Sequence, residues 1–391
     1  MNETPSAGAV ILGGDFLGLG IIRCLSEHQI PCFLVDYEFS ISRCSRYVNG
    51  QTADPRLLEP GYFTDYLIAV AKKYKVQDWV LYPTTDEMIK LISMDRQRLE
   101  QWYRIPVPSW DVVKNFYYKE NAYRIADSVS ISIPTMYNHA GLDDILNCNV
   151  TYPLVLKPSS KEDYYTKTKR KAVRVDDRHQ LIEEYTNMTA LIDPSRIVVQ
   201  EMVEGGPRNL YSYVTFFDGQ QSLGGMTARR LRQHPMDFGH ATTYAESVDV
   251  PEIVELGDRL LKKMGYWGIA EVEFMRDEKA NVYKFIEVNG RFWGWHTLAR
   301  AAGINFPTIV YDFMHGVRRS VPSPVIGVKW IRAITDIPTV AKEIISGRLS
   351  LQDYIGTIRG KKEFAVFSIK DPLPSLVELV IWPYLWVKRG F

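Results

Sequence analysis

The stretch Gly268–Arg291 reads GIAEVEFMRDEKANVYKFIEVNGR, two runs of alternating side chains joined by a polar turn. Successive side chains of a strand point to opposite faces, so Glu271 and Glu273 share one face of the first run. Glu287 and Asn289 share a face of the second run in the same way. An antiparallel hairpin is the simplest structure for this pattern, and it would carry Glu273, Glu287 and Asn289 toward a common side.

Three of these side chains form a donor set that suits one kind of ion. Glu273, Glu287 and Asn289 offer oxygen atoms. Mg²⁺ prefers oxygen ligands and is usually held by one or two carboxylates together with waters and substrate phosphates. The alternative is a polar face that only contacts solvent. Arg291 follows directly, and its planar guanidinium binds anions, so the combination favours a site for a nucleotide triphosphate and a second, anionic substrate.

The motifs VEF and IEVNGR of this hairpin resemble the metal-binding signature of the ATP-grasp superfamily. The usual signature ends in Asn-Pro-Arg, and Gly290 stands here in place of the proline, while the liganding residues are present. The resemblance implies that ATP is bound with one or two Mg²⁺ ions, or with Mn²⁺, held by Glu273, Glu287 and Asn289. It also implies a catalytic role for Arg291 in steadying the transferred phosphoryl group.

The composition limits the class of protein. A chain of 391 residues is long enough for two or three domains. Its formal net charge of +1 gives no electrostatic reason to expect a nucleic-acid partner. The four cysteines have no C-x-x-C spacing, which indicates free thiols in a reducing cytosol. Because the sequence also has neither a signal-peptide pattern nor a run of roughly 20 apolar residues, we expect a cytoplasmic protein.

The N-terminal segment predicts an open, parallel α/β sheet. Ala9–Gly20 reads AVILGGDFLGLG, an apolar strand that leads into a glycine-rich turn and a helical pattern, and a second buried strand ends at Asp36. The glycines do not fit G-x-G-x-x-G, which argues against a nicotinamide oxidoreductase. The turn either receives an anionic group at the start of the helix or is a tight strand-to-helix turn, the interpretation we favour.

A helix over Tyr62–Tyr74 and a strand over Asp78–Tyr82 are expected next. The following residues, PTTDEM, have the pattern of a helix start, with Thr84 or Thr85 as the cap. Loops after parallel strands line the crevice of such sheets, so Thr85 or Asp86 could also contact a substrate. Capping explains these residues equally well.

Two lysines match the nucleotide-binding positions of the ATP-grasp family. Lys119 lies in the helical segment Asp111–Ser128, and its role rests on the resemblance alone. Lys157 ends the apolar strand of YPLVLKPSS, where a partly buried ammonium needs a counter-ion such as a phosphate. The family's glycine-rich phosphate loop should follow, but SSKEDYYTKTKRKAVRV contains no glycine. The residues of this loop that could contact the phosphates are Ser159, Ser160, Lys161, Lys167 and Lys169. For each of these lysines a solvated hairpin tip is the favoured alternative.

The strand of RIVVQEMVEGG resembles the family's hinge between two lobes. The resemblance implies that adenine lies against Glu201, Met202 and Val203. Glu204 is the nearest candidate for the acid that binds the ribose. Glycine freedom after this strand, at 205–206, suits a hinge.

A basic run ends the next expected strand pair, YSYVTFFDGQQSLGGMTARRLRQHP. Neighbouring side chains of a strand alternate in direction, so Arg229, Arg230 and Arg232 cannot all point away from the site. We assign the catalytic role to Arg232.

The segment after residue 320 ends in the apolar and aromatic run LVELVIWPYLWVKRGF. Pro383 should break any long helix there. Packing against the chain's own surface or against a partner subunit, as in a homodimer, is the favoured role. Peripheral membrane contact through this segment, with its basic end, is the alternative.

In the order in which they occur, these motifs imply an α/β protein (α+β overall) with the ATP-grasp fold. The expected divisions are an N-terminal pre-ATP-grasp, Rossmann-like parallel-sheet domain (1–108), an ATP-grasp domain (109–320) with a lid lobe (109–199) and a metal-binding lobe (200–320), and a C-terminal extension (321–391).

Within the superfamily the sequence is most similar to carboxylate–amine ligases of the D-aspartate ligase kind. The implied reaction starts when a carboxylate attacks the γ-phosphate of ATP, giving an acyl phosphate and ADP; an amine then displaces phosphate and leaves an amide. Both substrates would be small molecules. The aromatic residues Tyr266, Trp267, Trp293 and Trp295 suggest a flat or apolar acceptor, and core packing explains them equally well.

Two other functions are considered. A bicarbonate-using carboxylase or carbamoyl-phosphate-type enzyme is disfavoured because the sequence contains no biotin-carrier or glutaminase segment. A non-catalytic ATP-binding module should have lost a metal ligand, and none is lost here.

Overall fold

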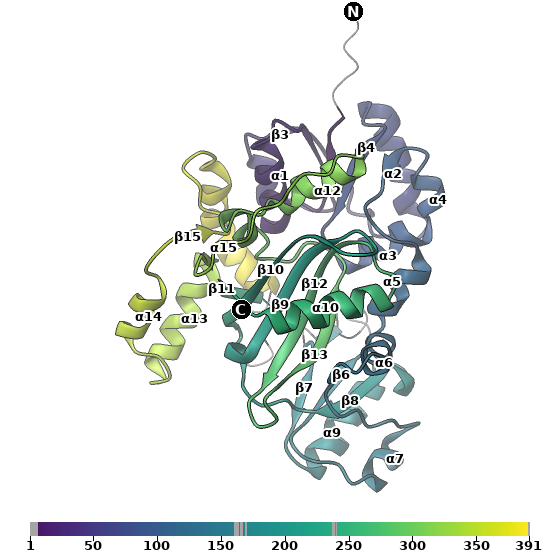
Figure 1. The fold of residues 1–391 in the computed structure, drawn as a ribbon, viewed down its shortest axis with the longest axis vertical. Coiled ribbons are helices and arrows are strands. Elements are labelled where there is room, and N and C mark those ends of the chain that lie inside the picture. The colour runs from purple at the N-terminus through teal and green to yellow at the C-terminus, as the bar shows by residue number, and fades with distance from the viewer. Residues whose placement is uncertain are drawn as a thin grey trace, which may run out of the picture.

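The computed structural model describes residues 7–159, 164, 167–168, 170–236, 239 and 241–389. These residues form a five-stranded, a three-stranded and a seven-stranded sheet. In Figure 1 the three-stranded sheet lies at one end of the molecule, the long strands of the seven-stranded sheet lie at its centre, and the five-stranded sheet lies toward the other end.

The five-stranded sheet has the order β3-β2-β1-β4-β5, and all its strand pairs are parallel. The strands are β1 (Ala9–Leu12), β2 (Cys32–Asp36), β3 (Val48–Ala53), β4 (Trp79–Pro83) and β5 (Tyr103–Arg104). Every residue of β1 and β2 is buried, as expected for a parallel sheet that is covered on both faces. The open parallel α/β sheet predicted for the N-terminal segment is confirmed.

Helices connect these strands, and Figure 1 shows them flanking the sheet. They are α1 (Phe16–Ser26), α2 (Tyr62–Tyr74), α3 (Asp86–Met94) and α4 (Arg96–Leu99). The helix α2 has its predicted bounds. At the start of α3, the Thr85 hydroxyl accepts a hydrogen bond from the Met88 amide at 3.2 Å, so Thr85, one of the two candidates, is the cap.

The segment Asp111–Ser128, predicted as one helix, is two helices. They are α5 (Trp110–Tyr117) and α6 (Lys119–Ser128), separated by Tyr118, whose φ of −96° and ψ of 117° are extended. The prediction of a continuous helix was wrong because neither glycine nor proline marks the break. The break makes Lys119 the first residue of α6.

The three-stranded sheet is antiparallel, with the order β7-β6-β8. Its strands are β6 (Leu154–Pro158), β7 (Val173–Val175) and β8 (Ile197–Glu201), and the helices α7 (Leu142–Asn147) and α9 (Arg178–Thr189) accompany it. Buried apolar side chains of these elements, such as Leu156 and Leu181, form a hydrophobic core of their own. This small lobe therefore has a hydrophobic core separate from the other two.

The seven-stranded sheet has the order β13-β12-β9-β10-β11-β14-β15. Its strands are β9 (Leu210–Phe217), β10 (Ser222–His234), β11 (Ala241–Val248), β12 (Gly268–Asp277), β13 (Val282–Asn289), β14 (Lys329–Ile331) and β15 (Lys362–Phe364). The strands β12 and β13 pair antiparallel, which confirms the predicted hairpin. Because β14 and β15 belong to the same sheet, the segment after residue 320 continues the fold of the preceding residues.

Two hydrophobic cores join the five-stranded and seven-stranded sheets. One contains Leu81 of β4 together with Val272 and Phe285 of the hairpin. The other contains Tyr82 of β4 and Trp293, which follows the hairpin. The helices around these cores are α10 (Pro251–Lys263), α11 (Thr297–Ala301) and α12 (Phe306–Met314). The hairpin is thus held between two layers of packed side chains.

The C-terminal part adds α13 (Ala333–Ile345), α14 (Leu351–Thr357) and α15 (Leu373–Arg389), while short 3₁₀ turns span Ile41–Cys44, Pro194–Arg196 and Pro207–Asn209. The helix α15 continues through Pro383, so the predicted break is wrong. A proline removes one backbone hydrogen bond, and here the helix tolerates that loss. Among the residues that the structure describes, no helix is long and apolar enough to cross a membrane.

Candidate active site

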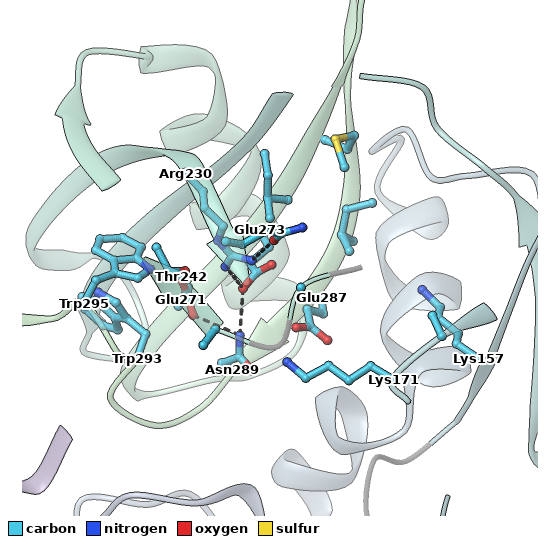
Figure 2. Close-up of a pocket in the computed structure, with 18 of the residues that line it drawn as sticks. Lys157, Lys171, Arg230, Thr242, Glu271, Glu273, Glu287, Asn289, Trp293 and Trp295 are labelled. Atoms are coloured by element: carbon cyan, nitrogen blue, oxygen red, sulfur yellow. Dashed lines mark hydrogen bonds and ion pairs between the residues drawn. The ribbon is translucent and has the colours of Figure 1, made fainter. Parts of the chain in front are cut away.

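A cavity of about 460 Å³ lies between the small lobe and the large sheet. One side is lined by residues of β6 and β8, including Val155, Lys157 and Gln200. The facing side is lined by residues of β10, β12 and β13. Figure 2 shows Lys157 at one end, the carboxylates in the middle, and the two tryptophans Trp293 and Trp295 at the other end.

The hairpin brings its oxygen-bearing side chains together in this cavity. In the register of β12 and β13, Glu273 lies opposite Glu287, and Glu271 lies opposite Asn289. The Asn289 amide nitrogen donates hydrogen bonds to Glu271 Oε2 at 3.1 Å and to Glu273 Oε1 at 3.4 Å (Figure 2). All four side chains line the cavity.

Glu271 is a site residue that the sequence analysis did not assign. Only 3% of it is exposed, and its Oε1 accepts a hydrogen bond from the Ser212 hydroxyl at 3.2 Å. Burial, and then the neighbouring Glu273 carboxylate, raise the pKa of Glu271 well above its usual value. The signal was present in the sequence, because Glu271 and Glu273 are two residues apart and a strand directs such residues to one face.

The chemistry of this donor set fits a hard divalent cation. Adjacent buried carboxylates repel each other, and a cation between them and a substrate phosphate would remove that repulsion. Within the described residues, no group of three or more His, Cys, Asp or Glu side chains is close enough to hold a metal ion on its own. Glu273, Glu287 and Asn289, with Glu271 beside them, are the residues that would hold Mg²⁺ here.

Arg230, rather than Arg232, points from β10 into the cavity. The pairing of β10 with β11 shifts register between Arg230 and Arg232, a β-bulge that reverses the direction in which later side chains point. Arg230 Nη2 lies 3.1 Å from Glu273 Oε1 and its Nη1 donates to Gln233 Oε1 at 3.4 Å. Regular alternation predicts one face for both arginines, and the bulge is what separates them.

The guanidinium of Arg232 is used elsewhere, so the structure does not support the catalytic role assigned to it. It forms two hydrogen bonds of 2.8 Å with the carboxylate of Asp336 on α13 and a third with the Thr357 hydroxyl. It also lies over the ring of Tyr244, 4.2 Å from its centroid. Arg232 and Asp336 are both buried. Arg232 thus attaches the C-terminal helices to the large sheet, and it does not line the cavity.

Arg291 lines the cavity, where the sequence placed it. Its Nε lies 2.9 Å from Asp86 Oδ1, and its Nη2 donates to Asp86 Oδ2 at 3.2 Å and to Asn289 Oδ1 at 3.4 Å. Asp86, at the start of α3, therefore orients the guanidinium from the five-stranded sheet. At position 290, a Cβ atom would lie only 2.5 Å from the ring of Phe116, so glycine suits the packing here.

The two predicted lysines approach the cavity from the small lobe and from α6. Lys157 is 7% exposed, and its Nζ donates to the Tyr123 hydroxyl at 2.6 Å. That hydroxyl in turn donates to the Ile286 carbonyl at 2.8 Å, which links the lysine to the hairpin. Lys119 Nζ lies 3.8 Å from Glu287 Oε2. Lys171, which the sequence analysis did not assign, also lines the cavity and extends toward the carboxylates (Figure 2).

The predicted hinge residues divide into two groups. Met202 and Val203 line the cavity. Glu201 instead forms an ion pair with Lys284 and accepts a hydrogen bond from the Thr135 hydroxyl at 3.0 Å. The remaining predicted contact on this loop, Glu204, is exposed and lies 2.9 Å from the Lys279 ammonium.

The loop after Lys157 contributes less to the cavity than the sequence suggested. Ser159 is buried, and its hydroxyl donates to the carboxylate of Glu120 rather than lining the cavity. Lys167 is exposed and donates to the Leu191 carbonyl at 3.3 Å. Ser160, Lys161 and Lys169 lie outside the described residues.

Comparison with known proteins identifies the fold. No protein-family model matches the chain. The D-aspartate ligase of Enterococcus faecium (strain Aus0004) is 20% identical over 298 residues, which cover 72% of this chain and 70% of that protein.

Solved structures are similar over most of the chain, and two serve as examples. The L-amino acid ligase from Bacillus licheniformis is 16% identical with a TM-score of 0.61, and the match covers 81% of this chain and 78% of that one. The biotin carboxylase domain of the Hydrogenobacter thermophilus 2-oxoglutarate carboxylase, solved with MgADP, ADP and bicarbonate, is 16% identical with a TM-score of 0.64, covering 82% and 73%. The chain has the ATP-grasp fold, as the hairpin motifs implied.

Proposed function

We propose that this protein is an ATP- and Mg²⁺-dependent carboxylate–amine ligase that activates a substrate carboxylate as an acyl phosphate and joins it to an amine. The observation that carries the proposal is a single cavity that places Lys119 and Lys157 on one side of the carboxylates and Arg230 and Arg291 beside them. Similarity to a D-aspartate ligase over 72% of this chain supports the same reaction class.

The carboxylates and the amide of the hairpin would hold one or two Mg²⁺ ions, which neutralise the charge of the β and γ phosphates when bound. Asn289 has a second role, because its amide donates to both Glu271 and Glu273 and so fixes the direction of their carboxylates. A fixed donor set favours one position of the triphosphate relative to the second substrate.

The cationic side chains would neutralise the charge that moves during phosphoryl transfer. Lys157, held by the Tyr123 hydroxyl, and Lys119 are placed for the phosphates that leave with ADP. Arg291 and Arg230 lie beside the metal-binding residues, where the transferred phosphoryl group and the acyl phosphate would lie. Arg230 takes the role in this scheme that the sequence pattern suggested for Arg232. No covalent intermediate on a side chain is required.

We also propose that adenine lies between Met202 and Val203 of the hinge and the apolar residues of β6, since these line the same cavity as Lys157. Glu201 and Glu204 are paired with lysines, so direct nucleotide contacts from their carboxylates require those ion pairs to rearrange.

A cytosolic location and a homodimer remain proposals. The four cysteines are all free, which suits a reducing compartment. The carboxylase domain that resembles this chain was solved as a dimer. The outward side chains of α15 are apolar, including Leu376, Val380 and Tyr384, and a second subunit that packs there would bury them. We do not favour peripheral membrane contact through this helix, since no comparison supports it.

The test is phosphate release from ATP and Mg²⁺ with a panel of amino acids and other carboxylates, each paired with an amine. Release that requires both partners establishes ligation. Glu287→Gln should abolish it, while Glu255→Gln, an exposed change on α10 far from the cavity lining, should not. Release with bicarbonate and no other carboxylate would show the carboxylase-type reaction instead. Failure to bind ATP would refute the proposal.

A further inference from the structure

The end of the cavity opposite Lys157 is built from aromatic rings (Figure 2). Trp293 and Trp295 line it, and their ring centroids are 5.4 Å apart. Phe16 and Leu17 from the first turn of α1 line the same cavity. Trp293 also packs edge-on against Phe306 at 5.5 Å, which fixes its ring in the core. This end therefore offers rigid apolar walls.

These tryptophans differ from an ordinary core tryptophan in their polar atoms. Each is at most 2% exposed, and among the described residues neither indole nitrogen has a hydrogen-bond acceptor. The Nε of Arg230, which lines the same cavity, is also buried without a partner in the described part of the chain. By contrast, the indole of Trp330, outside the cavity lining, donates to the Thr297 hydroxyl at 2.9 Å.

Buried indole N–H groups usually have a partner. Two such donors on residues that line one cavity, together with the Nε of an arginine from the same lining, match a group that has only acceptor atoms and a negative charge, which is a carboxylate. The rings themselves match an apolar or aromatic body.

We infer that Trp293 and Trp295 form the subsite for one substrate of the ligation, a monocarboxylate with an apolar or aromatic body whose carboxylate oxygen accepts hydrogen bonds from the indoles. The inference rests on the proposed function for the role of this substrate, but the binding itself is independent of nucleotide. It predicts a preference different from that of a D-aspartate ligase, because aspartate carries a second carboxylate and no apolar body.

The test is isothermal titration of the full-length protein in Mg²⁺ without nucleotide, with phenylacetate, benzyl alcohol and aspartate as probes. Trp293→Phe and Trp295→Phe each keep an aromatic ring and remove one donor. Each should weaken phenylacetate binding roughly tenfold, the size expected for one hydrogen bond to a charged group, and leave benzyl alcohol binding unchanged. Trp330→Phe is the matched control for the loss of a buried indole and should bind phenylacetate like the native protein.

Unchanged phenylacetate binding in both cavity variants would overturn the inference, and so would an equal loss in Trp330→Phe or tighter binding of aspartate than of phenylacetate. Phosphate release with ATP is read separately. If phenylacetate does not bind but ATP turns over with another pair, the subsite is refuted and the ligase stands. If the indoles bind phenylacetate and no pair supports turnover, the ligase is refuted and the subsite stands.

Discussion

The hairpin and the hinge were not equally predictable from the sequence, although residues of both line the cavity. At the hairpin, Glu273, Glu287, Asn289 and Arg291 all line the cavity. At the hinge and the loop after Lys157, three of the predicted contacts, Ser159, Glu201 and Glu204, are paired with other side chains instead. The difference shows where side-chain direction is determined locally. In the hairpin, strand alternation fixes the direction of each side chain. At the hinge, the direction of a side chain depends on partners that lie far away in the sequence.

The largest expected effect concerns the hairpin. Glu287→Gln keeps the size of the side chain and removes the charge that would hold Mg²⁺, so turnover should fall by roughly 10²- to 10³-fold, as when other fixed electrostatic groups are removed. The measurement is ATP turnover across a Mg²⁺ titration. Glu204→Gln at the hinge is the matched change, and it should lower turnover by less than about fivefold because an exposed ion pair contributes little. Equal losses in the two variants would contradict the contrast between the hairpin and the hinge.

The next prediction distinguishes the structural role of Arg232 from the proposed catalytic role of Arg230, both on β10. Arg232→Met leaves Asp336, which is fully buried, without its partner, and should lower the free energy of unfolding by about 3–5 kcal/mol. Urea unfolding measures this loss. The double change Arg232→Met with Asp336→Leu should recover most of it, since it removes both charges of the buried pair. Arg230→Met should instead act mainly on turnover, and a variant of Arg232 that folds normally but is inactive would restore its catalytic assignment.

The third prediction concerns the pH dependence of the free energy of unfolding, which a buried histidine in the large lobe should affect more than one in the small lobe. Burial lowers the pKa of His296, beside the aromatic end of the cavity, to about 4, so the unfolded chain binds a proton that the folded chain does not between pH 6.5 and 4. This contribution to stability is complete above pH 6.5 and is lost as the pH falls toward 4, up to about 3 kcal/mol. His296→Gln should flatten the decline in urea unfolding. His139 in the small lobe also has a pKa lowered by burial, but it is only partly buried, so His139→Gln should change the decline less.

The smallest effect tests the hinge directly. Glu201 pairs with Lys284, and the pair is partly exposed, so Glu201→Gln should change stability by about 1 kcal/mol or less. If the carboxylate stays with Lys284 when nucleotide binds, the KM for ATP should rise less than about threefold. A rise of tenfold or more would show that Glu201 contacts the nucleotide, as the resemblance to the family implied, and would remove the contrast drawn above. Lys284→Met is the control for loss of the ion pair alone.

Much of the fold follows from local pattern. The parallel opening, α2 and the β12–β13 hairpin each rest on a periodicity that is continuous over the whole element. The points at which helices end or continue were not predictable from periodicity. Tyr118 interrupts a helical pattern without a proline or glycine, whereas α15 continues through Pro383.

In the candidate site, too, local pattern determines some residues and long-range contacts determine others. Glu271 could have been assigned from its position two residues before Glu273. Arg230 could not, because the bulge that turns it into the cavity depends on how β10 pairs with β11. Lys171 and the ion pair of Glu201 depend on contacts between the lobes, which a single sequence does not specify.

The addition of β14 beside β11 has a consequence for the behaviour of shortened chains. The strand β14 pairs with β11 through Tyr244, Ala245 and Glu246. A chain that ended at residue 320 would leave β11 as an exposed edge, with a row of backbone N–H and C=O groups available to other molecules. Such edges pair with one another, so the shortened protein should aggregate even though every proposed metal ligand is present. The C-terminal segment thus protects the large sheet against self-association.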